Sequence, residues 1–450
     1  MALRRREVQR QQDLWISTSE IARSPGHVFY QRLSELLHEA SFDRFVEDSV
    51  AEFYASDGRP GVAPGVYFRM LFIGYFEAID SQRGIAWRCQ DSLSLRQFLG
   101  VKLTENVPDH SSMTRIRDRY TLEVTEKIFA FVLKLAAENR LISGTAVGVD
   151  STQLEANAAM KSIVRKETGE DWKDDIRRLM LEEKLIDKDD EPSDEELARF
   201  DRNRKGKKVS NKEWESPTDN DARITRMKDG RTRLGVKAEH TVDLETEVIL
   251  SSVVMHSTQT DQHTLIESVG EAQLNLERAG VDATISEVVA DKGDHTNQQI
   301  TESSELGLRT YIPEPKLKTN RRWTDKDEAI QRAVINNRCR TSRPKGKHLQ
   351  RRRSEVVERS FAHICETGGA RRSWLRGLEK INKRYSMVVA AHNLGLILRS
   401  RFGSGKPRHL AALRHVFDAS KHILLLRTST GISCRLFKTT LQRKPLRAAA

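Results

Sequence analysis

The feature that most constrains the fold is a change of hydrophobic period near residue 144. From there, short apolar runs with a period of two alternate with stretches of helical character, which predicts strands and helices in turn. The runs are TAVGVD, VKAEHTVD, EVILSSVV, ISEVVAD and LRTYIPEP, and the helical stretches between the last three are HTLIESVGEAQLNLERAG and TNQQITESSELG. Strands that alternate with crossover helices predict an α/β sheet.

The residues before this sheet, from about 28 to 138, predict helices. Apolar side chains recur at steps of three and four after Pro64, and again from Ile128 to Leu135. In the segment VPDHSSMTRIRDRY, three candidate N-cap residues precede a basic helix. The caps are Asp109, Ser111 and Ser112, and the basic residues are Arg115, Arg117 and Arg119. A helix–turn–helix that binds DNA and an ordinary helical bundle both fit this pattern.

A charged interval from about 158 to 230 separates the first predicted strand from the others. It is acidic at first and then strongly basic in RNRKGKKVSNK, with few apolar residues. Such a segment cannot bury much apolar surface. We therefore expect an insertion that is partly helical and then flexible.

Three carboxylates stand where folding alone does not require a charge. Asp150 ends the run TAVGVD, Asp291 ends SEVVAD, and Glu358 borders the apolar helix face that carries Val357 and Phe361. Carboxylates that meet at strand ends repel one another unless divalent cations neutralise them, and Mg²⁺ prefers such oxygen ligands. The chemistry indicated is phosphoryl transfer with two metal ions. Taken singly, each residue also fits a helix N-cap or a surface charge.

Net charge points to a polyanionic partner. The chain carries a formal charge of +12, and residues 338–384 hold 15 Lys or Arg against 4 Asp or Glu, so most of the excess lies there. Basic clusters bind nucleic acid by releasing counterions from its phosphates. Arg351, Arg352 and Arg353 are candidate phosphate contacts, although a solvated basic helix face is the alternative.

Composition excludes other classes of protein. With 450 residues, 38% of them hydrophobic, and no run of 18 apolar residues, the sequence predicts two or three soluble modules and no membrane span. The four cysteines are scattered, without zinc-ligand spacing, and no phosphate-binding loop of the GxxxxGK type is present. We expect a cytoplasmic protein that associates with the nucleoid when it is bound to DNA.

The order strand–Asp, hairpin, helix, strand–Asp, helix, strand, helix–Glu is that of an RNase H-like fold. At this level the sequence resembles the DDE transposases of bacterial insertion sequences. The matching segments are GVDSTQLEANAAM, SPTDNDARITRMKDGRT, VVADKG, RRRSEVVERSFAHICETGGARRSWLRGLEKINKR and HNLGLILR. With the helical N-terminal region, the resemblance covers roughly residues 30–410.

The resemblance implies cleavage of the element's ends and their joining to target DNA. It implies that Asp150, Asp291 and Glu358 are the catalytic residues and the ligands of two Mg²⁺ ions, for which Mn²⁺ can substitute. It also implies a homo-oligomer that assembles on the terminal inverted repeats and the target DNA. The arginines expected at DNA are Arg115, Arg117, Arg119, Arg351, Arg352, Arg353, Arg359, Arg371 and Arg372. A DNA-binding protein that no longer cuts, and a nuclease without strand transfer, remain the alternatives.

Two departures from the family pattern concern the site. Asp294 stands where an aromatic residue often follows DKG, and this extra carboxylate either perturbs the site or faces solvent. The signature Tyr-x2-Arg-x3-Glu-x6-Lys of part of the wider group is absent around Glu358. Contacts made through that signature are therefore not carried over.

The predicted organisation is an α/β protein with an RNase H-like catalytic core, preceded by an α-helical domain. A tail (1–27) precedes a helical domain that binds DNA ends (28–140). A catalytic domain follows (141–400), with an insertion (158–230) after its first strand, and a basic tail (401–450) ends the chain.

Overall fold

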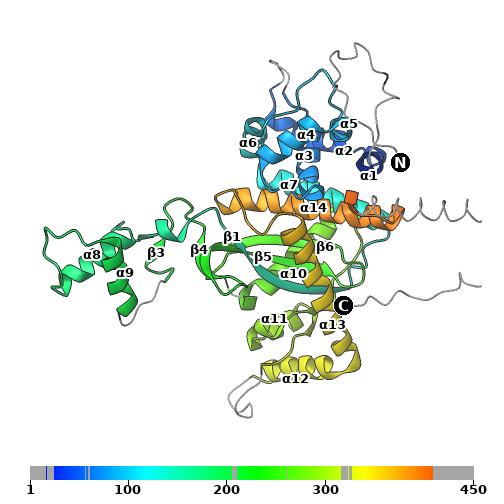
Figure 1. The fold of residues 1–450 in the computed structure, drawn as a ribbon. Coiled ribbons are helices and arrows are strands. Elements are labelled where there is room, and N and C mark those ends of the chain that lie inside the picture. Colours follow the sequence, from blue (N-terminus) through cyan, green and yellow to red (C-terminus); the bar gives the residue numbers. More distant parts are fainter. Residues whose placement is uncertain are drawn as a thin grey trace, which may run out of the picture.

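The structure, a computed structural model, describes residues 17, 25–55, 57–58, 61–204, 210–259, 261–315, 323 and 327–408. In these residues a helical N-terminal region is followed by a mixed α/β region (Figure 1). The change from helices to alternating strands and helices predicted near residue 144 is therefore confirmed. Most of the two predicted tails, 1–27 and 401–450, lies outside the described residues.

The N-terminal region is built around a helix that is buried on nearly all sides. The helical elements are α1 (Pro25–Glu39), α2 (Phe42–Val50), η1 (Ala51–Phe53), α3 (Pro64–Phe76), α4 (Gln82–Asp91), α5 (Leu93–Leu99), α6 (His110–Arg119) and α7 (Leu122–Glu138). Helix α3 begins with Pro64 at its first turn, where the missing N–H costs no hydrogen bond. Its side chains Phe68, Phe72 and Ile73 are fully buried, which explains the strong apolar signal of this segment.

Helix α6 begins at the predicted N-cap. The side chain of Asp109 accepts a hydrogen bond from the backbone N–H of Ser112 at 2.8 Å. Hydrogen bonds from Ser112 and Ser111 lower the pKa of the Asp109 carboxyl to about 2. The cap prediction is therefore confirmed for Asp109.

One mixed sheet forms the centre of the α/β region. Its six strands are β1 (Ala146–Glu155), β4 (Arg223–Arg226), β5 (Thr232–Asp243), β6 (Ile249–His256), β7 (Glu287–Val289) and β8 (Arg309–Tyr311). Strands β1, β7 and β8 run parallel, whereas β5 pairs antiparallel with β1, β4 and β6. The order β6-β5-β1-β7-β8 places β1 at the centre.

Strand β1 continues beyond the expected end, so the prediction that Asp150 ends its strand is wrong. Asp150 lies inside β1 opposite His240, and the pairing with β5 extends to Glu155 opposite Gly235. The long partner strand supplies backbone hydrogen bonds to the polar residues after Asp150, and these bonds keep them extended.

Helices cover both faces of the sheet. They are α10 (Asp261–Arg278), η3 (Lys292–Asp294), α11 (Asn297–Glu305), α12 (Glu328–Ser342), α13 (Pro344–Phe361), the π-helical turn η4 (Ala362–Thr367) and α14 (Leu378–Phe402). Successive β5 side chains point to opposite faces. Thr241 donates to the carbonyl of Ser268 on α10, whereas His240 hydrogen-bonds Ser360 on α13.

Helix α14 joins the two regions. Its Asn393 and Asn382 side chains each bond both the N–H and the C=O of a β6 residue, at 2.7–3.1 Å, and so satisfy backbone groups of that strand. On the N-terminal side, His392 of α14 hydrogen-bonds Tyr75 of α3 at 2.9 Å. Figure 1 accordingly shows α14 between the helical region and the sheet.

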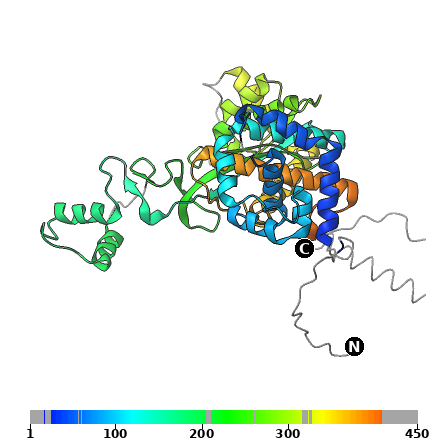
Figure 2. The ribbon, with the colours of Figure 1, turned by 90° about the horizontal axis from the view of Figure 1, so that it is seen from above.

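The segment 158–230 reaches away from the sheet before β4 in both ribbon views, whereas β4 itself belongs to the sheet (Figures 1 and 2). Before β4 it contains η2 (Met160–Ser162), β2 (Val164–Arg165), α8 (Trp172–Glu182), α9 (Asp194–Asn203) and β3 (Trp214–Glu215). Ile176, Met180 and Leu197 form a small apolar cluster between α8 and α9. The part expected to be flexible includes residues 205–209, which lie outside the described residues.

Candidate active site

Asp150 and Asp291 lie at equivalent positions on neighbouring parallel strands. The register pairs Gly148 of β1 with Val289 of β7, and each aspartate stands two residues further on. Adjacent strands are about 4.8 Å apart, and residues two apart point to the same face. Asp291 stands just beyond the end of β7, and its negative charge contributes to the raised pKa of Asp150, so the two carboxylates lie within electrostatic reach of one another.

Gly148 allows helix α13 to approach this point closely. A Cβ atom at residue 148 would stand 2.6 Å from Leu244 and 3.0 Å from both Arg353 and Val357. Any larger residue would push α13 away from β1. The glycine in GVD thus sets the distance between α13 and the strand that carries Asp150.

The Asp150 carboxylate is held by two donors. Its Oδ2 accepts from Nη1 of Arg353 at 2.9 Å, and its Oδ1 accepts from the backbone N–H of Ser151 at 2.8 Å. Burial raises the pKa of Asp150; the Arg353 charge and the Ser151 bond oppose this shift, and the negative charge of Asp291 adds to it. The interaction with Asp291 places the two carboxylates in one electrostatic environment.

Asp291 starts a short helical turn. It is the N-cap of η3, where its side chain accepts from the backbone N–H of Gly293. Asp294 points inward with 6% of its surface exposed, and its carboxylate accepts from the Asp291 backbone N–H at 3.2 Å. The extra carboxylate of this chain therefore does not face solvent: it fixes the turn that carries Asp291.

Glu358 lies on α13, directly after Val357, which packs against Gly148. Its side chain is exposed, and within the described part of the chain it has no hydrogen bond or ion pair. One turn earlier on the same helix, Arg353 binds Asp150. Glu358 is thus in the part of α13 that crosses β1, but it faces outward.

The donor chemistry of these residues fits a hard divalent cation, because carboxylate oxygens are the ligands that Mg²⁺ prefers. Two of the three carboxylates are brought together by adjacent strands, and their repulsion is the kind that a cation relieves. Within the residues described, no three side chains of His, Cys, Asp or Glu are gathered closely enough to hold an ion. The structure thus supplies a carboxylate pair, with Glu358 outside it.

The three consecutive arginines of α13 point in different directions. Arg351 is exposed and has no partner among the described residues. Arg352 donates to the backbone carbonyl of Leu244 at 2.8 Å. Arg353 is buried on Asp150, with 7% of its surface exposed. Only Arg351 therefore presents an open guanidinium on the surface.

The other predicted arginines are held by neighbouring groups. Arg359 pairs with Glu247 at 2.6 Å, Arg371 pairs with Glu366 at 2.6 Å, and Arg372 lies 4.3 Å above the ring of Trp374. On α6, Arg115 and Arg119 are exposed, whereas Arg117 is buried and pairs with Asp118 at 3.2 Å. Arg115 and Arg119 thus share an exposed face, as their spacing predicts, and the Arg119 guanidinium lies 5.1 Å from the centre of the Tyr54 ring.

Sequence reasoning missed the role of Arg353 as the partner of Asp150. The signal was present: Arg353 stands four residues before Val357 and eight before Phe361, on the face of the helix predicted to be buried. An arginine on a buried helix face needs an anionic or carbonyl partner. That rule separates Arg353 from its two neighbours.

Comparison with protein families gives two matches. The family model described as Transposase domain (DUF772) matches residues 18–119, and the model described as Transposase DDE domain matches residues 314–398, which include Glu358. Neither the comparison with curated proteins nor that with solved structures gave a match. Among the described residues, no helix has the length and apolar character needed to cross a membrane.

Proposed function

We propose that the chain is a DDE transposase of an insertion sequence, which cleaves the ends of such an element and joins them to target DNA through Asp150, Asp291 and Glu358, because transposase family models match residues 18–119 and 314–398. The observation that carries this proposal is the meeting of Asp150 and Asp291 at equal register on β1 and β7. A transposase acts on phosphodiesters, and this carboxylate pair is the group suited to that chemistry.

The sheet supports an RNase H-like core. Strands β1, β5 and β6 form an antiparallel meander, and β7 and β8 join β1 in parallel on its other side. On this assignment the segment 158–230 is an insertion between the first and second core strands. The helices α10 and α13 lie on opposite faces, and α13 crosses β1 at Gly148 through Val357, the residue before Glu358.

In the proposed mechanism, each side chain has a separate task. Asp150 and Asp291 would hold divalent cations, Mg²⁺ by preference and Mn²⁺ as a substitute, and Glu358 would complete the ligand set from α13. Two such ions would supply activation of the attacking oxygen, from water or a 3′-hydroxyl, and stabilisation of the leaving oxygen. Arg353 orients Asp150 by holding Oδ2, and Arg351 lies free to contact a phosphate.

The helical N-terminal region is proposed to recognise the ends of the element. Its helix α6 is capped by Asp109 and presents Arg115 and Arg119 on one exposed face, which suits a major groove. The carboxylate site contacts phosphates and few bases, so sequence must be recognised elsewhere. Cutting two ends together also needs more than one active site, and we therefore propose a homo-oligomer on DNA.

A single reaction tests this function. Purified protein is incubated with DNA that contains the element's end, Mg²⁺ and a target plasmid, and the products are separated on a denaturing gel. Joined product is the expected result. Binding without cutting would identify a protein that only binds DNA, and nicks without joined product would identify a nuclease. Asp150→Asn is the control that must form no product.

A further inference from the structure

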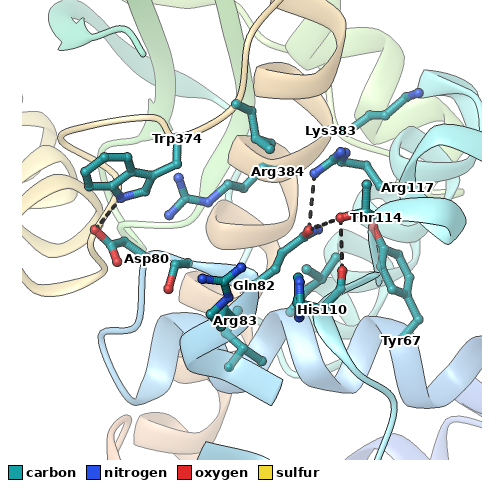
Figure 3. Close-up of a pocket in the computed structure, with 14 residues that line it drawn as sticks. Tyr67, Asp80, Gln82, Arg83, His110, Thr114, Arg117, Trp374, Lys383 and Arg384 are labelled. Atoms are coloured by element: carbon teal, nitrogen blue, oxygen red, sulfur yellow. Dashed lines mark hydrogen bonds between the residues drawn. The ribbon is translucent and has the colours of Figure 1, made fainter. Parts of the chain in front are cut away.

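A cavity of about 620 Å³ lies where the N-terminal helices meet the segment before α14 (Figure 3). It is lined from one side by residues of α3, α4 and α6 and from the other by residues between 374 and 384. Its volume is within the range of sites that bind small molecules or single nucleotides. None of the three carboxylates of the proposed active site lines it.

Trp374 forms one wall of this cavity and is held in place. Its indole N–H donates to Asp80 at 2.7 Å, and the guanidinium of Arg372 lies 4.3 Å from its ring. Even so, 44% of Trp374 is exposed. An indole fixed at its edge and left open to a cavity is suited to stack on a flat ring, and every DNA base offers one.

The wall is cationic. Four of its side chains carry positive charge and one, Asp80, is a carboxylate; the cations are Arg83, Arg117, Lys383 and Arg384. Arg117 and Lys383 have carboxylate partners, at 3.2 and 2.5 Å. Of the other two, Arg384 interacts with the charge of Asp80, whereas Arg83 has no carboxylate partner in the described part of the chain, so a small excess of positive charge remains in the cavity wall.

The two remaining arginines are set up to receive an anion. Arg384 donates to the backbone carbonyls of Gly369 and Arg372 at 3.3 and 3.5 Å, and burial lowers the pKa of its guanidinium. Arg83 is exposed and, in the part of the chain described, has no partner. Arg384 is half-buried, and its hydrogen bonds go only to carbonyls, with the charge of Asp80 nearby; a phosphate would give such a guanidinium a charged acceptor.

The cavity is connected to the strand of the active site. The backbone N–H of Ser373 donates to the carbonyl of Glu155 at 2.9 Å, and that of Glu155 donates to the carbonyl of Arg371 at 3.0 Å. Glu155 lies five residues beyond Asp150 on β1, a distance of about 16 Å along a strand. This span corresponds to about five nucleotides of one strand in a duplex.

From this geometry we infer that the cavity binds one unpaired nucleotide of the DNA substrate, with its base on Trp374 and its phosphate between Arg83 and Arg384. The inference rests on the proposed function, since DNA is the substrate placed at Asp150. The occupant is a nucleotide within a strand: the cavity lies close enough to Asp150 for one strand to reach both, and the cations recognise the strand's phosphate.

The first test compares two DNA probes with the full-length protein, in the absence of metal. One is a forked duplex whose last bases, about five per strand, are unpaired, as the span to Asp150 suggests; the other is fully paired. Trp374→Ala should lower affinity for the fork about tenfold, the loss typical of one stacked base, and leave the paired duplex unaffected. Trp374→Phe retains an aromatic face and should keep most of the affinity.

Matched variants complete this test. Trp87→Ala removes another exposed tryptophan, on α4 but outside the cavity wall, and should have no effect on either probe. Arg83→Ala changes an exposed residue, so it tests the phosphate contact even if Trp374→Ala does not fold; it should weaken fork binding and flatten its salt dependence. Equal loss on both probes, or no loss with either variant, would overturn the inference.

A second test locates the nucleotide. A single abasic site is moved along the unpaired strand, and one position should lower affinity in wild type but not in Trp374→Ala, because the base and the indole form one contact. Additive losses at every position would show that no base of the strand occupies the cavity. These measurements need no catalysis, so failure of strand transfer leaves them interpretable.

Discussion

Neutralising Asp150 and neutralising its partner Arg353 should have unequal effects on stability. Burial raises the pKa of Asp150, so the folded protein tolerates an uncharged group at this position better than a carboxylate. Arg353→Met would instead leave the Asp150 carboxylate, which burial disfavours, without the guanidinium that opposes this shift. We therefore expect Asp150→Asn to abolish cleavage without loss of stability, and Arg353→Met to destabilise the protein.

The structure sets the size of both effects. Removal of one partner of a buried ion pair costs about 3–5 kcal/mol, and because 30% of the Asp150 side chain is exposed we reduce this to about 2–3 kcal/mol for Arg353→Met. Asp150→Asn weakens the interaction with Arg353, but it also removes the cost of burying a carboxylate. Because these two effects oppose each other, the free energy of unfolding should change by less than about 1 kcal/mol. The double variant should recover part of the loss seen with Arg353→Met.

Unfolding in urea at pH 7, followed by circular dichroism, measures all three variants against wild type. Nicking of DNA that contains the element's end is measured on the same preparations. A loss with Asp150→Asn as large as that with Arg353→Met would mean that Asp150 serves mainly to hold Arg353. Retained nicking by Asp150→Asn would remove Asp150 from the catalytic residues.

Other predictions concern the rest of the site and its surroundings. Asp291→Asn and Glu358→Gln should each reduce nicking to background while DNA affinity in the absence of metal stays unchanged; residual nicking by either variant would exclude that residue. Arg351→Ala should reduce the slope of log affinity against log salt by about one unit, whereas an unchanged slope would mean that Arg351 contacts no phosphate. His240 is fully buried between Ser360 and Tyr385, and burial lowers its pKa to about 3. In the unfolded chain this histidine has a pKa near 6.5 and is protonated at pH 5, whereas in the folded protein it stays neutral. Acidification from pH 7 to pH 5 should therefore lower the free energy of unfolding of the wild type by about 2 kcal/mol more than that of His240→Gln. An equal loss in both proteins would contradict this prediction.

The sequence alone determined most of the secondary-structure elements and indicated the candidate carboxylates. Hydrophobic period is a local property, which is why the helices before residue 144, the five core strands and the cap at Asp109 could be predicted. Asp291 was correctly placed after its strand, because a charge that follows VVA marks the end of a buried run. The family resemblance was likewise present in the sequence, since it rests on ordered motifs and not on contacts.

Tertiary structure decided how these residues face one another. Asp150 lies within its strand because β5 pairs beyond it, and Arg353 turns inward because Gly148 lets α13 approach. Trp374 meets Asp80, 294 residues away in the chain, only because the N-terminal helices pack on α14 and the segment before it. Pairing, close approach and docking depend on what lies opposite a residue in space, and the period of a single segment carries no information about that.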